Sequence, residues 1–219
     1  MIRLEGVTKS YNKKNVLINA NLLAKEGEIT LLTGKSGSGK STLLNIISGI
    51  QVYDSGNYFV NKVKLDVYDD QYMSQFRNAK IGYIVQDYAL IEEYSVLENI
   101  LLPSMYNKKF EKKDIQDKAI LLAKDFGLFD IIYKKVKHIS GGQKQRTAIA
   151  RSLILDPAII LADEPTTNLD EENFLLIIDL FESLKKAKKL IIIATHDDRI
   201  KSIANKIYRI DDTILEQES

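Results

Sequence analysis

The stretch Gly34-Lys35-Ser36-Gly37-Ser38-Gly39-Lys40-Ser41 decides the fold of this chain, and it directly follows the apolar run at 29–33. It matches the phosphate-binding pattern G-x-x-x-x-G-K-[ST], which lies where a strand passes into a helix. Glycine has no side chain and adopts positive φ freely, so the backbone N–H groups of such a loop can surround a polyphosphate. We therefore predict that the chain binds a nucleoside triphosphate.

Each type of residue in this loop has a role in binding a polyphosphate. Lys40 brings a mobile positive charge to the β- and γ-phosphates, and the Ser41 hydroxyl can bind Mg²⁺. Because a side chain at Gly37 or Gly39 would hold the backbone amides away, glycine is expected at both positions. The helix that begins near Ser41 directs the positive end of its dipole at the anion. The predicted nucleotide-binding residues of the loop are Gly34, Lys35, Ser36, Gly37, Ser38, Gly39, Lys40, Ser41 and Thr42.

Composition limits what else the chain can be. Its 219 residues are 45% hydrophobic and 28% charged, which suits one large α/β domain, or a core with a smaller lobe. The formal net charge of +1 gives no reason to expect nucleic acid or anionic lipid as an obligatory partner. The absence of cysteine excludes disulfides and thiolate metal sites, and it fits a reducing cytoplasm. No apolar run approaches the ~20 residues of a membrane span, and the first residues lack the pattern of a secretion signal. Any membrane contact is therefore expected to go through another protein.

The hydrophobic pattern divides the chain into three parts. Before residue 88 it predicts strands at 2–8, 16–24, 28–33, 57–60, 62–65 and 81–85, with a helix at 42–50. From 88 to 155 the patterns are helical, at 95–105, 112–126 and 142–155. After 155, strands at 158–162, 190–194, 206–210 and 213–216 accompany helices at 171–186 and 198–204. We expect a single domain, 1–219, in which a catalytic α/β core (1–87 and 156–219) is interrupted by a helical subdomain (88–155).

Lysine is abundant in the helical insert, where acidic residues alternate with it. A solvated helix face explains this pattern, and contact with anionic lipid headgroups is the alternative. The lysines concerned are Lys108, Lys109, Lys112, Lys113, Lys118, Lys124, Lys134, Lys135 and Lys137.

A second motif is the run Ile159-Ile160-Leu161-Ala162-Asp163-Glu164-Pro165, an apolar strand that ends in two acids. Such a strand places its carboxylates at the carboxyl edge of the sheet, beside the phosphate loop. Asp163 is positioned to bind Mg²⁺ through water, because magnesium keeps most of its hydration shell. Glu164 is positioned to orient and polarise the water that attacks the γ-phosphate, as a general base.

A third motif, His138-Ile139-Ser140-Gly141-Gly142-Gln143, precedes an amphipathic helix. Ser140 is a suitable N-cap, and the paired glycines leave the first helical amides open to an anion. The motif resembles the S-G-G-Q signature of the ATP-binding-cassette (ABC) ATPases, with Ile139 where leucine is usual. In that family two copies dimerise head to tail, and the signature of each copy caps the γ-phosphate bound by the other. The resemblance therefore adds Ser140, Gly141, Gly142 and Gln143 to the expected ATP-binding residues.

The resemblance implies roles for four further residues, each at a matching position in this chain. Tyr11 matches the aromatic residue that stacks on adenine, with packing as the alternative role. Gln86 matches the glutamine that contacts Mg²⁺ and the attacking water while its loop senses the membrane partner. Asp170 matches the residue that couples the two sites across the dimer, and His196 matches the histidine that contacts the γ-phosphate.

For the chain as a whole, the resemblance implies the α/β phosphate-loop ABC ATPase fold: a mixed-sheet, RecA-like core with an antiparallel β-subdomain and an inserted α-helical subdomain. It also implies ATP and Mg²⁺ as cofactors, an ATP-dependent homodimer and a transmembrane permease on a separate chain. The protein would then be cytoplasmic and peripheral on the inner face of the membrane. The partner's cytoplasmic helix would contact residues 87–98, so charge reversal at Glu92 and Glu93 is expected to uncouple transport while sparing basal ATPase.

Around residues 83–100 and 161–170 the sequence is similar to the LolD/MacB/BceA group of these ATPases, although Thr167 stands where that group often has glycine. Within the group, export of antimicrobial peptides or bacteriocins, or resistance to them, is the favoured function. An FtsE-like signalling ATPase and an ATPase of lipoprotein release or macrolide export are the alternatives. DNA repair and translation are disfavoured, because the chain has no sustained heptads and a single cassette.

Overall fold

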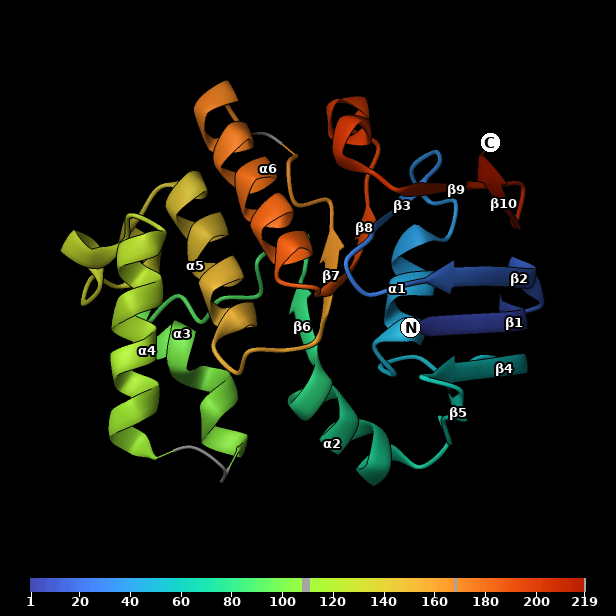
Figure 1. Cartoon of the computed structure of the whole chain (residues 1–219), viewed down its shortest axis with the longest axis horizontal. Coiled ribbons are helices and arrows are strands. Elements are labelled where there is room, and N and C mark those ends of the chain that lie inside the picture. The colour runs from blue at the N-terminus through green and yellow to red at the C-terminus, as the bar shows by residue number, and fades with distance from the viewer. Residues whose placement is uncertain (108–110, 168, 219) are drawn as a thin grey trace.

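The computed structural model describes residues 1–107, 111–167 and 169–218, which form two β-sheets with helices between and beside them (Figure 1). Lys108 and Lys109 of the lysine-rich insert lie outside these ranges. The smaller sheet has the order β2-β1-β4-β5, and its pairs are antiparallel. Its strands are β1 (Ile2–Tyr11), β2 (Lys14–Ala24), β4 (Ser55–Val60) and β5 (Val63–Lys64).

The larger sheet has the order β10-β9-β3-β8-β7-β6 and is parallel except for β10, which runs antiparallel to β9. Its strands are β3 (Ile29–Thr33), β6 (Ile81–Ile84), β7 (Ile159–Asp163), β8 (Leu190–Ala194), β9 (Lys206–Asp211) and β10 (Ile214–Glu218). Every residue of β3, β7 and β8 is buried, as expected for parallel strands covered on both faces. The carboxyl ends of these strands therefore meet at one edge of the sheet.

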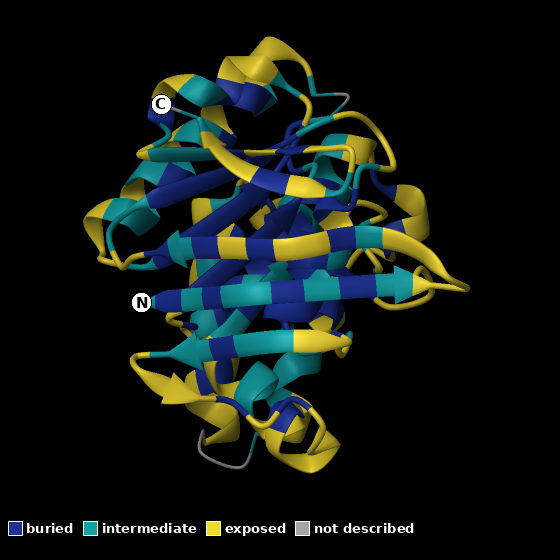
Figure 2. Cartoon of the chain, turned by 90° about the vertical axis from the view of Figure 1, so that its right-hand side faces the viewer, coloured by how far each residue is buried: buried dark blue, intermediate teal, exposed yellow. Residues whose placement is uncertain are grey.

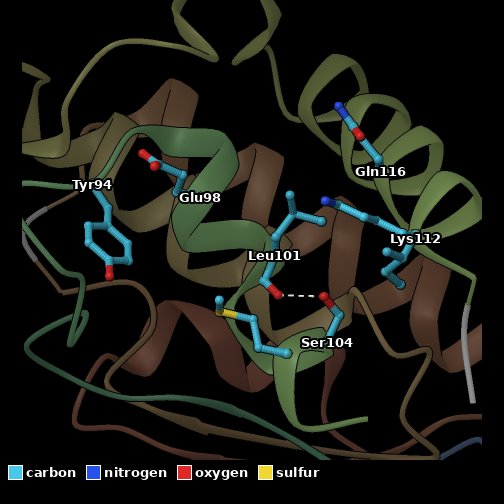
Figure 3. A pocket seen from close by; sticks show the side chains of 8 residues that line it. Tyr94, Glu98, Leu101, Ser104, Lys112 and Gln116 are labelled. Atoms are coloured by element: carbon cyan, nitrogen blue, oxygen red, sulfur yellow. Dashed lines mark hydrogen bonds between the residues drawn. The ribbon is translucent and has the colours of Figure 1, made fainter. Parts of the chain in front are cut away.

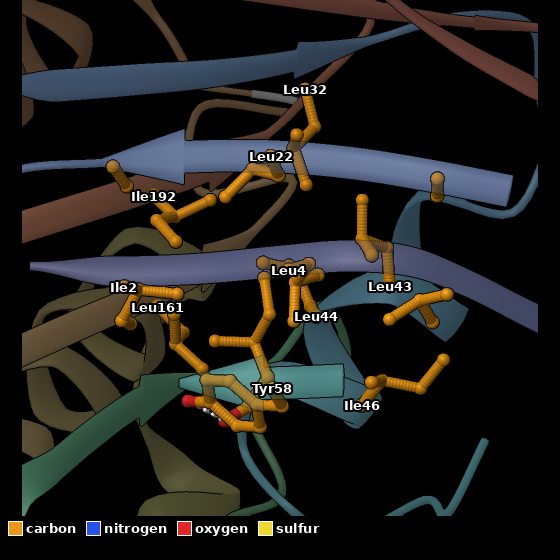
Figure 4. Packing of buried hydrophobic residues seen from close by; sticks show 14 of the residues in the cluster. Ile2, Leu4, Leu22, Leu32, Leu43, Leu44, Ile46, Tyr58, Leu161 and Ile192 are labelled. Carbon is orange, nitrogen blue, oxygen red and sulfur yellow. Dashed lines mark hydrogen bonds between the residues drawn. The ribbon is translucent and has the colours of Figure 1, made fainter. Parts of the chain in front are cut away.

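Helix α1 (Lys40–Ile47) lies between the two sheets and joins their cores. In Figure 4, Leu43, Leu44 and Ile46 of this helix pack among side chains of both sheets, such as Leu4 and Leu161. Strand β1 alternates between more and less buried residues, because one face of the smaller sheet covers α1 while the other faces outward (Figure 2). The phosphate loop is thus anchored at both ends in the main core.

The opposite face of the larger sheet is covered by α5 (Gly141–Leu153), α6 (Glu171–Lys186) and the 3₁₀ segment η4 (Asp198–Ile203). A third core joins α5 to α3 (Val96–Leu101) and α4 (Lys112–Asp125), in the helical part of the chain. Three shorter 3₁₀ segments complete this part: η1 (Leu102–Tyr106), η2 (Phe129–Ile131) and η3 (Val136–His138). Across residues 1–107, 111–167 and 169–218, no helix combines the length and the apolar character that a bilayer crossing requires.

The structure departs from the sequence expectation at three helices. Helix α2 (Asp70–Lys80) was not predicted, because Met73 is its one buried residue and its apolar pattern is correspondingly weak. Helix α1 ends at Ile47, before a turn in which Gly49 has a φ of +70°. The helix expected at 95–105 becomes a 3₁₀ segment from Leu102, where proline follows as the next residue. The helix expected at 198–204 is the 3₁₀ segment η4, and the other expected strands and helices are present, with ends that shift by a few residues.

Candidate active site

The predicted catalytic residues converge on one edge of the larger sheet. Strand β3 leads into the phosphate loop, β6 into Gln86, β7 into Glu164 and β8 into His196. The register fixes their alignment, since Ala194 at the end of β8 pairs with Leu32 on one side and Asp163 on the other. Four segments that are far apart in the sequence therefore contribute to one site.

The glycines of the phosphate loop are required for different reasons. A Cβ added at Gly34 would lie 2.5 Å from the carbonyl oxygen of Ile210, and one at Gly39 would lie 3.0 Å from Val16 Cγ1. At Gly37 a Cβ would meet nothing within 4 Å, so the φ of +76° is what favours glycine there. The sequence pointed to Gly37 and Gly39, but among the glycines of the loop the closest approach is at Gly34.

Lys40 is buried at the base of the loop, with a side chain only 6% exposed. Its Nζ donates to the carbonyl oxygens of Gly34 at 2.8 Å and Lys35 at 3.2 Å. The same Nζ lies 3.9 Å from Glu164 Oε1, so the phosphate loop and the acidic motif are in direct electrostatic contact. A buried ammonium needs such partners, and the phosphates of a nucleotide would be stronger ones.

The oxygen donors beside the loop fit a hydrated magnesium ion. Asp163 is buried, and burial raises the pKa of its carboxyl, while a hydrogen bond from the Ser41 hydroxyl acts to lower it. Asp163 Oδ1 is buried without a hydrogen-bond partner among the described residues, and so is Ser38 Oγ. Hard oxygen atoms without partners, next to a phosphate loop, suit the coordination that Mg²⁺ prefers. Ser41 and Asp163, which the sequence analysis assigned to Mg²⁺, are neighbours in the structure.

The Glu164 carboxylate is strongly constrained. Its backbone has a φ of +51°, which is uncommon for a residue with a side chain. Oε2 accepts hydrogen bonds from Thr167 Oγ1 at 3.1 Å and Thr195 Oγ1 at 3.2 Å, and from the His196 N–H at 3.3 Å. Oε1 lies 2.8 Å from His196 Nδ1 and faces Lys40. Sequence reasoning found Glu164 and His196 but missed both threonines, because nothing in the pattern shows where a hydroxyl points.

Gln86 lies at the edge of the site, in an exposed turn after β6, and makes no hydrogen bond within the described residues. Tyr88 and Ala89, later in this turn, have φ values of +63° and +44°. Arg151 of α5 donates to the carbonyl oxygens of Tyr88 at 2.6 Å and Ala89 at 2.5 Å. Burial lowers the pKa of this guanidinium, and the negative charge of Asp87 opposes that effect. The signature helix therefore holds the turn that carries Gln86.

Tyr11 lies at the end of β1, and 43% of its surface is exposed. Lys9 Nζ lies 5.1 Å from the centre of its ring and is itself paired with Asp54 Oδ1 at 3.1 Å. Tyr11 pairs with Lys14 in the β1–β2 hairpin. Val16, two residues after Lys14, lies beside Gly39 of the phosphate loop. The ring is thus exposed on the hairpin that borders the phosphate loop.

The signature residues do not join this site within one chain. Ser140 caps α5 in a reciprocal arrangement, in which its Oγ accepts from the Gln143 N–H at 3.3 Å and its N–H donates to Gln143 Oε1 at 3.0 Å. Among the described residues, no hydrogen bond or ion pair connects residues 140–143 to the phosphate loop or to Glu164. Figure 1 shows α5 and α1 on opposite sides of β7 and β8. A Cβ at Gly141 would meet nothing within 4 Å, whereas one at Gly142 would lie 3.3 Å from Asn173 Oδ1.

Asp170 caps the other helix that faces this region, α6. Its Oδ1 accepts from the N–H of Asn173 at 2.9 Å and from Asn173 Nδ2 at 2.8 Å. These bonds, the backbone one first, lower the pKa of the Asp170 carboxyl. Arg146 of α5 donates to Asn173 Oδ1, so the signature helix and the start of α6 are joined here.

A separate groove of about 580 Å³ lies in the helical part of the chain (Figure 3). It is formed by α3, η1 and α4. Two of its lining residues are joined by a hydrogen bond of 2.6 Å, from Ser104 Oγ to the carbonyl oxygen of Leu101. Its lining residues are Tyr94, Glu98, Leu101, Ser104, Met105, Lys112, Ile115 and Gln116. None of the predicted catalytic residues lies in this groove.

Known proteins resemble this chain over nearly its whole length. The sequence model of the family described as ABC transporter matches residues 17–167. The lipoprotein-releasing system ATP-binding protein LolD of Treponema denticola is 35% identical over 215 residues, which is 96% of this chain and 95% of that protein. The ABC transporter ATP-binding protein YvrO of Bacillus subtilis is 38% identical over 216 residues, 97% of this chain and 94% of that protein.

Solved structures agree with the sequence comparison. The dimeric structure of MJ0796, a bacterial ABC transporter cassette, is similar with a TM-score of 0.92 and 35% identity, and covers 100% of this chain and 98% of that one. The same cassette in a post-hydrolysis state bound to ADP and Pi also gives a TM-score of 0.92, with 34% identity and the same coverage. The predicted fold class is confirmed by this likeness. The chain therefore belongs to the ABC transporter family, as one of its ATP-binding cassettes.

Proposed function

We propose that this ATPase hydrolyses ATP as a head-to-tail dimer and thereby powers a separate membrane-spanning partner. The observation that carries the hydrolytic part is the position of Glu164, whose carboxylate lies between Lys40 of the phosphate loop and His196. A carboxylate fixed at this point, beside a loop that binds the β- and γ-phosphates, can accept a proton from a water molecule in line with the γ-phosphorus.

The proposed reaction uses the chain's own residues in distinct roles. As the water oxygen bonds to the γ-phosphorus, its proton passes to Glu164, and the bond from that phosphorus to the bridging oxygen of ADP breaks. Lys40 exchanges the loop carbonyls for phosphate oxygens, and His196 donates to the γ-phosphate. Ser41, Asp163 and Gln86 would hold Mg²⁺, which supplies charge neutralisation at the phosphates.

Dimerisation is supported by the signature residues. Ser140 and Gly141 are exposed, and the space beside Gly141 is open within the chain. A site made of exposed helical amides and a serine hydroxyl suits an anion that a second molecule brings. The similar cassette MJ0796 has been solved as a dimer, which supports the same arrangement here. In such a dimer we infer that Asp170, at the start of α6, couples the two sites.

The partner is proposed to insert a helix into the groove of Figure 3. Tyr94 and Glu98 of the groove lie within the segment 87–98 that the sequence assigned to this contact. Met105 on its rim is 73% exposed, and an exposed apolar side chain beside a groove suits an amphipathic partner helix. Cargo is expected to be recognised by the partner. Export of antimicrobial peptides remains the sequence-based proposal for it, and the LolD relative supports lipoprotein release as the alternative.

The test replaces Glu164 by glutamine, which keeps the shape of the side chain but cannot accept the proton. Binding of ATP should persist, turnover should fall by about 10²–10⁴-fold, and the protein should accumulate as an ATP-bound dimer in gel filtration. Glu172→Gln, at an exposed position of α6, is the matched control and should behave as wild type. Wild-type turnover in Glu164→Gln would overturn the proposed role of this residue.

A further inference from the structure

The turn that follows the catalytic strand directs a hydroxyl back onto Glu164. The Thr167 N–H donates to the carbonyl oxygen of Glu164 at 3.4 Å, which closes a four-residue turn. From this position Thr167 Oγ1 reaches Glu164 Oε2 at 3.1 Å. The turn is further fixed from two sides, by Gln145 Nε2 on the carbonyl oxygen of Pro165 at 2.9 Å and by Thr166 Oγ1 on Asp197 Oδ2 at 3.1 Å.

A carboxylate needs such fixing, because the last torsion of a glutamate side chain has broad minima and rotates easily. Three donors on Oε2 restrict this rotation and leave Oε1 on the side of Lys40. The three are not equivalent. The Thr195 hydroxyl donates to Glu164 and also accepts from the Asp197 N–H at 3.0 Å, so its removal would break two hydrogen bonds. The His196 N–H is part of the backbone and cannot be removed by a side-chain change. Thr167 is incompletely buried and lies outside the strands. Of the three donors, it is therefore the one that a side-chain substitution can remove with the least disturbance of the structure.

We propose that Thr167 is a positioning residue whose hydroxyl fixes the orientation of the Glu164 carboxylate for hydrolysis. This inference rests on the proposed role of Glu164 as the general base. Thr167 acts through Glu164, so its loss should lower kcat and leave the binding of ATP unchanged. The expected size is about 3- to 30-fold in kcat, which lies within the range for one hydrogen bond to a neutral or charged group.

Three variants of this position separate the hydroxyl from the shape of the side chain. Thr167→Val removes the hydroxyl and keeps the branched shape, Thr167→Ser keeps the hydroxyl, and Thr167→Gly removes the side chain. We expect Val and Gly to lower kcat by a similar factor, with KM for ATP and the dissociation constant changed less than twofold. Ser should restore at least half of the wild-type kcat. Thermal melting of each variant verifies that it is folded.

The matched control is Thr30→Val on β3, since Thr30 is fully buried and its Oγ1 has no hydrogen-bond partner among the described residues. Its kcat should equal that of wild type. Combination with Glu164→Gln gives a second readout, measured as the single-turnover rate: Thr167→Val should lose its effect once the carboxylate is gone.

The outcomes separate the two proposals. A Glu164→Gln enzyme with wild-type turnover would refute the general-base role itself. If Glu164→Gln is inactive while Thr167→Val has the wild-type kcat, Glu164 keeps its role and the inference on Thr167 is wrong. A serine variant as slow as the valine variant would also overturn it, because shape and not the hydroxyl would then be responsible.

Discussion

Gln145 Nε2 donates a hydrogen bond of 2.9 Å to the carbonyl oxygen of Pro165, and so joins the signature helix to the turn after the catalytic strand. Gln145 is buried, with 4% of its surface exposed, and lies one turn inside α5 from Ser140. If Ser140 caps the phosphate of a partner, as proposed above, this bond connects that event to Glu164 of the same chain. In such a dimer each chain contributes to two composite sites, to one with Glu164 and to the other with Ser140. The hydrogen bond between Gln145 and Pro165 connects these two parts of the same chain.

Asp163→Asn is expected to stabilise the free protein while it abolishes magnesium-dependent turnover. Burial raises the pKa of this carboxyl, so its ionised form destabilises the folded state at neutral pH. The melting midpoint without nucleotide should rise at pH 7, by about 2–4 °C for each 1 kcal/mol of relieved destabilisation in a domain of this size. As the pH falls through the raised pKa, wild-type Asp163 becomes neutral and the difference between the two proteins should shrink. A lower midpoint for the variant at pH 7, measured by calorimetry, would contradict this account.

Tyr11→Ala is expected to weaken the binding of ATP by ~1–3 kcal/mol, which is the range for stacking of a base on an aromatic ring. The preference for ATP over GTP should also fall, because the ring expected to stack on adenine is then missing. Lys9→Met should have a smaller effect, about 2- to 5-fold in affinity, through the ammonium that faces this ring. Tyr133→Ala, at a position 75% exposed in the helical part, is the control. Unchanged nucleotide affinity in Tyr11→Ala, by titration calorimetry, would assign the ring to packing instead.

Ser140→Arg is expected to block ATP-driven dimerisation and to leave ATP binding by the monomer nearly intact. Because Ser140 also caps α5, the change should cost about 1 kcal/mol of stability. Ser140→Asn retains an N-cap and tells the two effects apart. Lys40→Ala should instead weaken triphosphate binding and abolish turnover, since it removes the buried ammonium of the loop. Mixing Ser140→Arg with Lys40→Ala protein should restore about one working site per heterodimer. If the mixture stays inactive although it forms heterodimers, the composite site is wrong.

The structure changes the test of the membrane contact. Glu92 and Glu93, where charge reversal was expected to uncouple transport, already pair with lysines near the signature: Glu92 with Lys144 at 3.4 Å, and Glu93 with Lys135 at 3.2 Å and Lys137 at 2.7 Å. Charge reversal there would also disturb the contact between the Gln86 segment and α5. A substitution on the rim of the groove avoids this difficulty.

Met105→Asp is therefore the sharper variant. Loss of a buried methionine from an interface, about 1.5–3 kcal/mol, should weaken binding of the partner by at least tenfold. The ATPase activity without the partner should be unchanged, because Met105 is 73% exposed and lines a groove that contains none of the predicted catalytic residues. Tyr133→Asp is the matched exposed control. Binding is measured by co-purification of the membrane partner, and wild-type recovery with Met105→Asp would exclude the groove as its site.

The sequence was sufficient where one residue type determines one structure. The apolar runs 159–162 in β7 and 190–194 in β8 predicted short buried strands, and the glycine pattern after β3 predicted a phosphate loop. It was insufficient where the structure depends on distant partners. Helix α2 has one buried side chain, Met73, and so little apolar pattern to detect. The bonds of Thr167 and Thr195 to Glu164 depend on the pairing of β7 with β8 and on a φ of +51°, neither of which a local pattern contains.

The contact between Gly34 and the carbonyl oxygen of Ile210 has a practical consequence for handling the protein. Ile210 belongs to the β9–β10 hairpin, and Thr213 in the turn of this hairpin accepts a hydrogen bond of 2.9 Å from the Ile18 N–H of β2. The last hairpin thus supports the phosphate loop and the β1–β2 hairpin together. A fusion tag or a truncation that loosens residues 206–218 would disturb the phosphate loop and thereby weaken nucleotide binding. An affinity tag is therefore better placed at the amino end of the chain or behind a long spacer.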